Sequence, residues 1–132
     1  MAIEMEYQKR SLRANPILLA SEKKGKYSYY VLSMGSHPCA YIELPKDHPY
    51  FDKPYSDIPI LCHGGLTYGS SYLNTISNND EERYFIGWDY AHYGDYVYYD
   101  SLFLPVLDGK RWTTNEMIQE CLDVISQLEE LE

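Results

Sequence analysis

The sequence WTTNEMIQECLDVISQL, residues 112–128, combines a helix start signal with a helical apolar pattern. Thr113 and Glu116 have the spacing of a capping box with Thr113 as the N-cap, and Trp112 and Met117 flank it as a hydrophobic staple. Apolar residues then recur every three or four positions, as they do on one face of an amphipathic helix. The predicted buried stripe comprises Ile118, Cys121, Leu122, Ile125 and Leu128. The residues expected to face water are Glu120, Asp123, Glu129 and Glu130.

Upstream of this helix, short apolar runs alternate with turns and prolines. Tyr29–Met34 and Cys39–Leu44 are predicted to be the strands of one hairpin, separated by a break at His37-Pro38. Tyr84–Asp89 has the same strand character, whereas residues 45–59 hold four prolines and are predicted to form an ordered loop. A helix that packs on one face of a small, mostly antiparallel sheet gives an α+β fold.

Five other segments complete the expected organisation. Glu4–Ala14 is predicted to be helical, and Lys23–Lys26 to be a turn that leads into the first strand of the hairpin. The apolar run Ile58–Cys62 is expected to be a strand end that delivers the motif after it. Asn74–Glu82 is polar and is expected to be a surface loop, and Tyr96–Tyr99 has the aromatic and β-branched residues of a strand.

The length of 132 residues and a hydrophobic content of 45% indicate one folded domain, residues 1–132. No apolar run reaches the ~18 residues of a spanning helix, and the acidic start lacks the order of a secretory signal. Cys39, Cys62 and Cys121 are odd in number and lack CxxC spacing, so they are interpreted as buried thiols of a reducing compartment. These features predict a soluble, cytoplasmic protein without membrane contact.

Charge is distributed unevenly along the chain. Residues 1–53 hold eight basic and six acidic side chains, whereas residues 54–132 hold three and fourteen. The acidic second half disfavours direct nucleic-acid binding, because phosphate contacts need clustered cations. Two interpretations of this excess stay open: it imitates nucleic acid in the basic groove of a partner protein, or it keeps a protein with 15 tyrosines soluble.

Two glycine-rich motifs concentrate the polar chemistry: CHGGLTY, residues 62–68, and GWDYAHYGD, residues 87–95. Glycine permits positive φ and a close approach of backbone to ligand. The motifs predict a pocket in which glycine amides bind oxygen atoms and aromatic rings stack on the base of a nucleotide-like small molecule. His63 and the loop from Asp89 to Asp95 are expected to converge on one concavity. The predicted ligand-binding residues are His63, Gly64, Gly65, Thr67, Tyr68, Trp88, Asp89, His92, Tyr93 and Asp95.

A second interpretation of the same motifs is an enzyme without a bound cofactor. Asp89, His92 and Asp95 follow one another at three-residue spacing and, with His63, would serve acid–base or metal-assisted hydrolysis, or would hold a metal ion. The opposing interpretation is structural: Asp89 caps backbone amides and His92 bonds a carbonyl. Cys62 and His63 are neighbours that point to opposite faces of an extended chain, so they do not form a nucleophile–base pair, whereas Cys62 with His92 stays open.

These interpretations predict different responses to alanine substitution. Alanine at Ile125 or Leu122 is expected to destabilise the protein by about 2–5 kcal/mol, as truncations in a buried core do. Alanine at His92 or Asp95 is expected to leave the fold largely intact and to abolish binding or activity. Under the structural interpretation, alanine at Asp89 or His92 would instead lower the melting temperature as much as the core substitutions do.

Four stretches together resemble a family of small proteins of tailed bacteriophages and prophages: GSHPCAYIELPKDHPYF, CHGGLTYG, FIGWDYAHYGD and KRWTTNEMIQECLDVISQL. The resemblance runs from Tyr30 to Leu128, so residues 27–132 are expected to be a family-like core and residues 1–26 a variable N-terminal extension. It implies a phage accessory protein in the cytoplasm of an infected bacterium. Such a protein would counter host defence by sequestering a nucleotide signal or, like an anti-CRISPR protein, by blocking a defence protein. A homo-oligomer also stays open.

Overall fold

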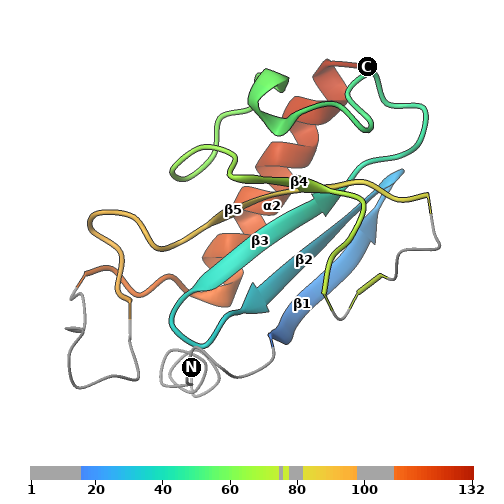
Figure 1. Ribbon diagram of the computed structural model, residues 1–132. Coiled ribbons are helices and arrows are strands. Elements are labelled where there is room, and N and C mark those ends of the chain that lie inside the picture. The colour runs from blue at the N-terminus through green and yellow to red at the C-terminus, as the bar shows by residue number, and fades with distance from the viewer. Residues whose placement is uncertain (1–15, 75, 78–81, 98–108) are drawn as a thin grey trace.

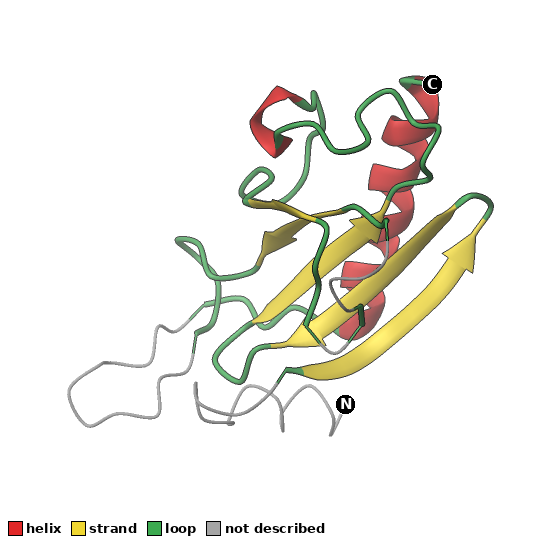
Figure 2. Ribbon diagram, turned by 45° about the vertical axis from the view of Figure 1, so that its right-hand side comes forward, coloured by secondary structure: helices red, strands yellow, loops and turns green. Residues whose placement is uncertain are grey.

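The computed structural model describes residues 16–74, 76–77, 82–97 and 109–132, and these form an α+β fold (Figure 1). Five strands make one sheet in the order β1-β2-β3-β5-β4, and every neighbouring pair is antiparallel. Helix α2 packs against one face of this twisted sheet (Figure 2). The predicted fold class is therefore confirmed. The elements are β1 (Ile17–Lys24), β2 (Tyr27–Ser33), β3 (Pro38–Glu43), the 3-10 helix η1 (Tyr55–Asp57), β4 (Tyr68–Ser70), β5 (Phe85–Asp89) and α2 (Thr114–Glu130).

Helix α2 begins as predicted. The Thr113 hydroxyl accepts a hydrogen bond from the Glu116 amide at 3.1 Å, and the Glu116 carboxylate accepts one from the Thr113 amide at 3.0 Å. The buried face is rotated relative to the prediction, because Ile118 and Leu122 are only half-buried. The line of contact with the sheet instead runs through Met117, Cys121, Val124 and Leu128, which are four, three and four residues apart. The buried residues of the helix are Met117, Cys121, Val124, Ile125 and Leu128.

The two faces of the sheet bury different clusters, since side chains alternate along each strand. Tyr29 and Val31 of β2 face α2, whereas Leu32 lies in a second cluster on the opposite face. In that second cluster the Tyr41 ring lies over Gly87, where a Cβ would be only 2.3 Å from the ring. Glycine in β5 is therefore required by packing and not by a ligand.

Several predicted elements differ from the structure. The hairpin of β2 and β3 and the strand β5 are confirmed, but β1 and β4 had no counterpart in the sequence prediction. Ile58–Cys62 is not a strand: Pro59 lacks an amide hydrogen, and the backbone of Leu61 bonds the Gln127 side chain instead of a neighbouring strand. The predicted helix Glu4–Ala14 lies outside the described residues. Within the described part of the chain, no helix is long and apolar enough to span a membrane.

Candidate functional site

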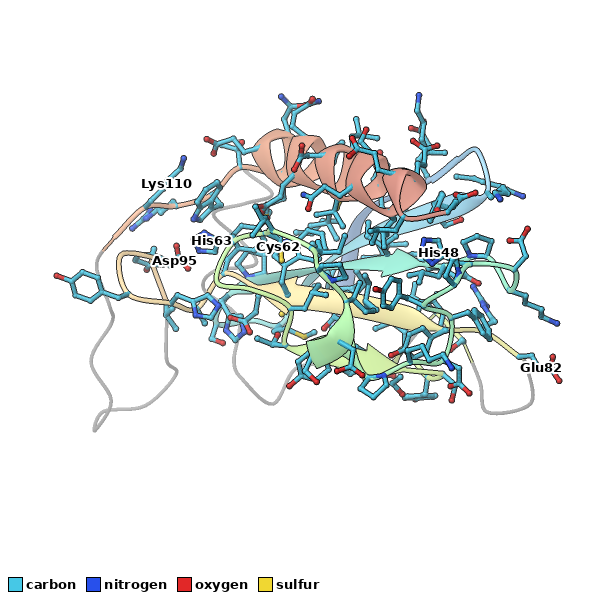
Figure 3. All side chains as sticks on the ribbon, turned by 90° about the horizontal axis from the view of Figure 1, so that it is seen from above. His48, Cys62, His63, Glu82, Asp95 and Lys110 are labelled. Carbon is cyan, nitrogen blue, oxygen red and sulfur yellow. The ribbon has the colours of Figure 1, made fainter. Side chains whose placement is uncertain are left out.

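Three segments meet at one end of the sheet: the turn of residues 62–65, the loop of residues 90–95 and the approach to α2 at residues 109–113. His63 and Asp95 lie side by side there, with Nε2 of His63 2.7 Å from Oδ2 of Asp95 (Figure 3). The predicted proximity of His63 to the loop after β5 is confirmed. The loop is also tied to the third segment, because the Tyr96 amide bonds the Lys110 carbonyl at 2.9 Å.

Glycines shape the turn that carries His63. Gly64 and Gly65 both have positive φ, 70° and 80°, and the Gly65 amide bonds the Cys62 carbonyl at 3.0 Å. A Cβ on Gly64 would lie 2.1 Å from Nε2 of His92, so the His92 ring occupies the space that a side chain would need. The Gly-Gly pair thus allows a turn that brings two imidazoles together, at 5.6 Å between ring centroids.

Asp95 is the organising residue of the site. Its side chain is only 3% exposed and accepts three hydrogen bonds, from Nε2 of His63, from the His92 amide at 2.9 Å and from Nε1 of Trp112 at 2.8 Å. Burial alone would raise the pKa of Asp95, but these hydrogen bonds, that of His63 foremost, outweigh burial and hold the pKa below its usual value. Asp95 is therefore a carboxylate that only accepts.

His63 is held in one orientation by rings and hydrogen bonds. Its imidazole stacks on Tyr90 at 4.9 Å with an interplanar angle of 9°, and the Trp112 ring is also 4.9 Å away. Because Asp95 accepts, Nε2 of His63 carries the hydrogen. Nδ1 has no hydrogen-bond partner among the described residues, and the side chain is 22% exposed. A neutral His63 thus presents an unpaired acceptor nitrogen at the surface of the site.

Glu120 is a site residue that the sequence prediction placed in water. Its carboxylate accepts from the His63 amide at 2.8 Å, from Nε1 of Trp88 at 3.1 Å and from the Tyr90 hydroxyl. Burial, followed by this hydrogen bond to Glu120, raises the pKa of Tyr90. The position of Glu120 in the helix could have indicated this role, because it lies three residues after the buried Met117, at the edge of the apolar stripe.

Asp89 and His92 form the outer part of the site. Asp89 accepts from the Ala91 amide at 3.1 Å and from the Thr67 hydroxyl at 3.3 Å, so it does cap a local amide, as the structural interpretation predicts. Nε2 of His92 lies 3.1 Å from Oδ1 of Asp89, but the geometry makes no hydrogen bond, and this buried nitrogen lacks a hydrogen-bond partner among the described residues. His37 lies near this pair, and burial lowers its pKa while the charge of Asp89 opposes that effect.

Three predicted stacking residues do not surround His63. Tyr68 packs edge-on against Tyr41 at 5.3 Å on the far face of the sheet, and Trp88 is 1% exposed within the core. Tyr93 is fully exposed and contributes no wall to a pocket. The amides of His63 and Gly65 already donate inside the protein. The predicted aromatic clamp of Tyr68, Trp88 and Tyr93 is therefore not formed around His63, and two amides of the turn are not free to bind a phosphate.

Metal and cysteine chemistry receive no geometric support at this end. No group of three or more His, Cys, Asp or Glu side chains within the described residues is arranged to hold a metal ion. Burial raises the pKa of Cys62 to about 12, and the charge of Glu120 adds to this effect. A protonated Cys62 is a weak nucleophile, which speaks against its pairing with His92. A cavity of about 620 Å³ lies at the other end of the sheet and not around His63.

Comparison with known proteins returns no relative. No protein-family model, curated protein or solved structure matches this chain. The resemblance to phage proteins accordingly stays a prediction.

The network around Asp95 predicts a loss of stability at acid pH. Because the native state holds the pKa of Asp95 below 3.8, its contribution is complete above the unfolded-state pKa and is lost as the pH falls through the lower native value. Urea denaturation from about pH 5 to about pH 2 measures this loss as a falling free energy of unfolding. The Asp95→Asn variant, which cannot titrate there, should lose less stability over the same range. Equal losses in both proteins would contradict the assignment.

Proposed function

We propose that the protein binds a small, uncharged, hydrogen-bonding ligand at His63, and that it does so as a phage accessory protein that counters a host defence. The observation that carries the binding site is the buried carboxylate of Asp95, which fixes the His63 ring, while Nδ1 has no partner among the described residues and can accept a hydrogen bond when the ring is uncharged. Rigid placement of a polar group in advance lowers the entropy cost of binding. The phage context rests on the sequence resemblance.

Charge restricts the part of a ligand that this site would contact. The carboxylates of Asp89, Asp95 and Glu120 lie around His63. Lys110 lies over the Trp112 ring at 3.9 Å but is paired with Glu116 at 2.9 Å, so this end of the sheet favours a neutral group over a phosphate. A nucleotide-derived molecule would instead present a base edge or a sugar hydroxyl to Nδ1. A nucleoside-like ligand therefore fits this site, whereas binding of a phosphate by the glycine amides is disfavoured.

The test is to purify the protein from a bacterial lysate, denature it and analyse the released small molecules by mass spectrometry. The matched variants are His63→Gln, which replaces the ring, and Tyr93→Phe, which changes an exposed aromatic residue of the loop of residues 90–95. Wild type and Tyr93→Phe should release the same molecule, and His63→Gln about tenfold less, because the imidazole that bonds the ligand is lost. Equal release from all three proteins would refute the site. No small molecule on any of them would favour the acidic protein–protein inhibitor.

A second candidate function, acid–base hydrolysis, is favoured by one detail of the same geometry. A histidine whose hydrogen-bearing nitrogen is held by a buried carboxylate has its other nitrogen ready to accept a proton, as a general base must. The same purification distinguishes the two functions. If the protein is a hydrolase, wild type should carry the reaction product and His63→Gln the intact precursor. If it is a binding protein, both should carry the same unchanged molecule.

A further inference from the structure

The cavity of about 620 Å³ lies at the end of the sheet opposite His63. Figure 3 shows Glu82, one of its lining residues, at the far end of the molecule from Asp95. Its volume is within the range of small-molecule sites in proteins. The lining has four basic and two acidic side chains, although the whole chain has a net charge of −9. The lining residues with a charge are Lys23, Lys26, Lys46, Arg83, Glu43 and Glu82.

Two charged lining residues of this cavity, Arg83 and Glu43, hold each other in place. Arg83 donates to both oxygens of Glu43, from Nε and from Nη2, each at 2.9 Å. The Tyr30 hydroxyl donates to the same carboxylate at 2.8 Å. Burial alone would raise the pKa of Glu43, but the hydrogen bonds and charge of Arg83 lower it, so the two charges are present together and compensate each other. The excess positive charge of the cavity therefore comes from its lysines.

The lysines at the rim are available to a ligand. Lys23 has no ion pair among the described residues, and Lys46 pairs only with Glu82, at 3.2 Å, through side chains that are both largely exposed. Lys26 contacts Asp47 at 3.5 Å through exposed side chains and Glu132 at 2.8 Å, whose carboxylate is 30% exposed and also accepts from the Tyr27 hydroxyl. Exposed pairs of this kind contribute little to stability, so an anion of higher charge can displace the carboxylates.

We propose that this cavity binds a small molecule through a polyphosphate group. Three lysines from separate positions in the sequence, Lys23, Lys26 and Lys46, line one open volume. A multiply charged anion can interact with several of them at once, which a single carboxylate cannot do. Arg83 is held by Glu43 and contributes to the floor, so recognition depends on lysines as point charges and not on a guanidinium fork. This site is independent of His63, and neither proposal requires the other.

Isothermal titration calorimetry with sodium tripolyphosphate at low salt tests the proposal. In the β1–β2 register Lys23 lies opposite Ser28, and both residues line the cavity. Its neighbour Lys24 lies opposite Tyr27, whose side chain is on the helix-covered face, and Lys24 does not line the cavity. Lys23→Gln should weaken binding about fivefold, and Lys24→Gln, which removes the same charge, less than twofold. Equal weakening by both variants would show a general charge effect, and no binding to wild type at millimolar tripolyphosphate would also overturn the site.

Nuclear magnetic resonance then locates the anion and identifies its source. Tripolyphosphate should shift the amide signals of Ser28 and Tyr30 and leave those of His63 and Asp95 in place. Shifts confined to the His63 end would overturn the cavity as the site. Titrations with ATP distinguish two sources of the polyphosphate group. If the natural ligand is a nucleotide, ATP should bind more tightly than tripolyphosphate. If it is free polyphosphate, the two should bind equally well. The His63→Gln variant should retain tripolyphosphate binding, so failure of the first proposal is seen separately.

Discussion

Replacing Asp95 with alanine should lower the free energy of unfolding by about 3–5 kcal/mol. The substitution removes the acceptor of three hydrogen bonds and leaves Nε2 of His63, the His92 amide and Nε1 of Trp112 without it. Each buried donor that loses its partner costs about 1–3 kcal/mol, and local relaxation recovers part of the sum. Urea denaturation followed by circular dichroism measures the change.

Asp89→Ala is the matched control, since it removes a carboxylate from the same loop. The Asp89 side chain is 26% exposed and water can replace its bonds to Ala91 and Thr67, so a loss of about 1 kcal/mol is expected. The sequence motif had suggested that alanine at Asp95 leaves the fold intact, and burial of this residue reverses that expectation. Equal losses from the two variants would show that Asp95 does not organise the loop.

This reversal affects how function should be tested. A loss of binding in Asp95→Ala would be ambiguous, because the variant also loses much of its stability. His63 is the better target, since its ring is partly exposed and only one of its side-chain nitrogens is bonded among the described residues. Gln at position 63 keeps a polar side chain but cannot accept a proton as an imidazole does.

Features set by short sequence patterns were predicted well. The capping box of Thr113 and Glu116 lies within four residues, and its hydrogen bonds form as the pattern indicates. The hairpin of β2 and β3 was found for the same reason, because apolar runs and the break between them are local. The proximity of His63 to Asp95 followed from a general rule of neighbouring segments, although the run before His63 is not a strand.

Features that depend on side-chain direction in three dimensions were missed. Glu120 was assigned to water because it falls off the predicted apolar stripe, but its carboxylate accepts a hydrogen bond from the His63 amide. Tyr68 and Trp88 were assigned to one pocket because they lie in the two motifs, whereas Tyr68 points to the far face and Trp88 into the core. Strand alternation and the crossing of α2 decide these directions, and neither can be read from residue types alone.

The basic cavity was missed for a related reason. Lys23 and Lys26 flank a turn, whereas Glu43 and Arg83 are forty residues apart in sequence and meet only because β3 pairs with β5. The sequence showed only that the first 53 residues hold most of the cations. The pairing of β1 with β2, of β2 with β3 and of β3 with β5 is what brings these charged residues to one place.

Ile125→Ala should lower the free energy of unfolding by about 2–5 kcal/mol, whereas Leu122→Ala should cost only about 1 kcal/mol. The two residues belonged to one predicted stripe, but Ile125 is 2% exposed against the sheet and Leu122 is half-buried at its margin. Both substitutions place alanine in the middle of α2, so the difference between them reports burial more than helix propensity. Urea denaturation of both variants measures it. A Leu122 loss as large as that of Ile125 would mean that a further surface covers this side of the helix.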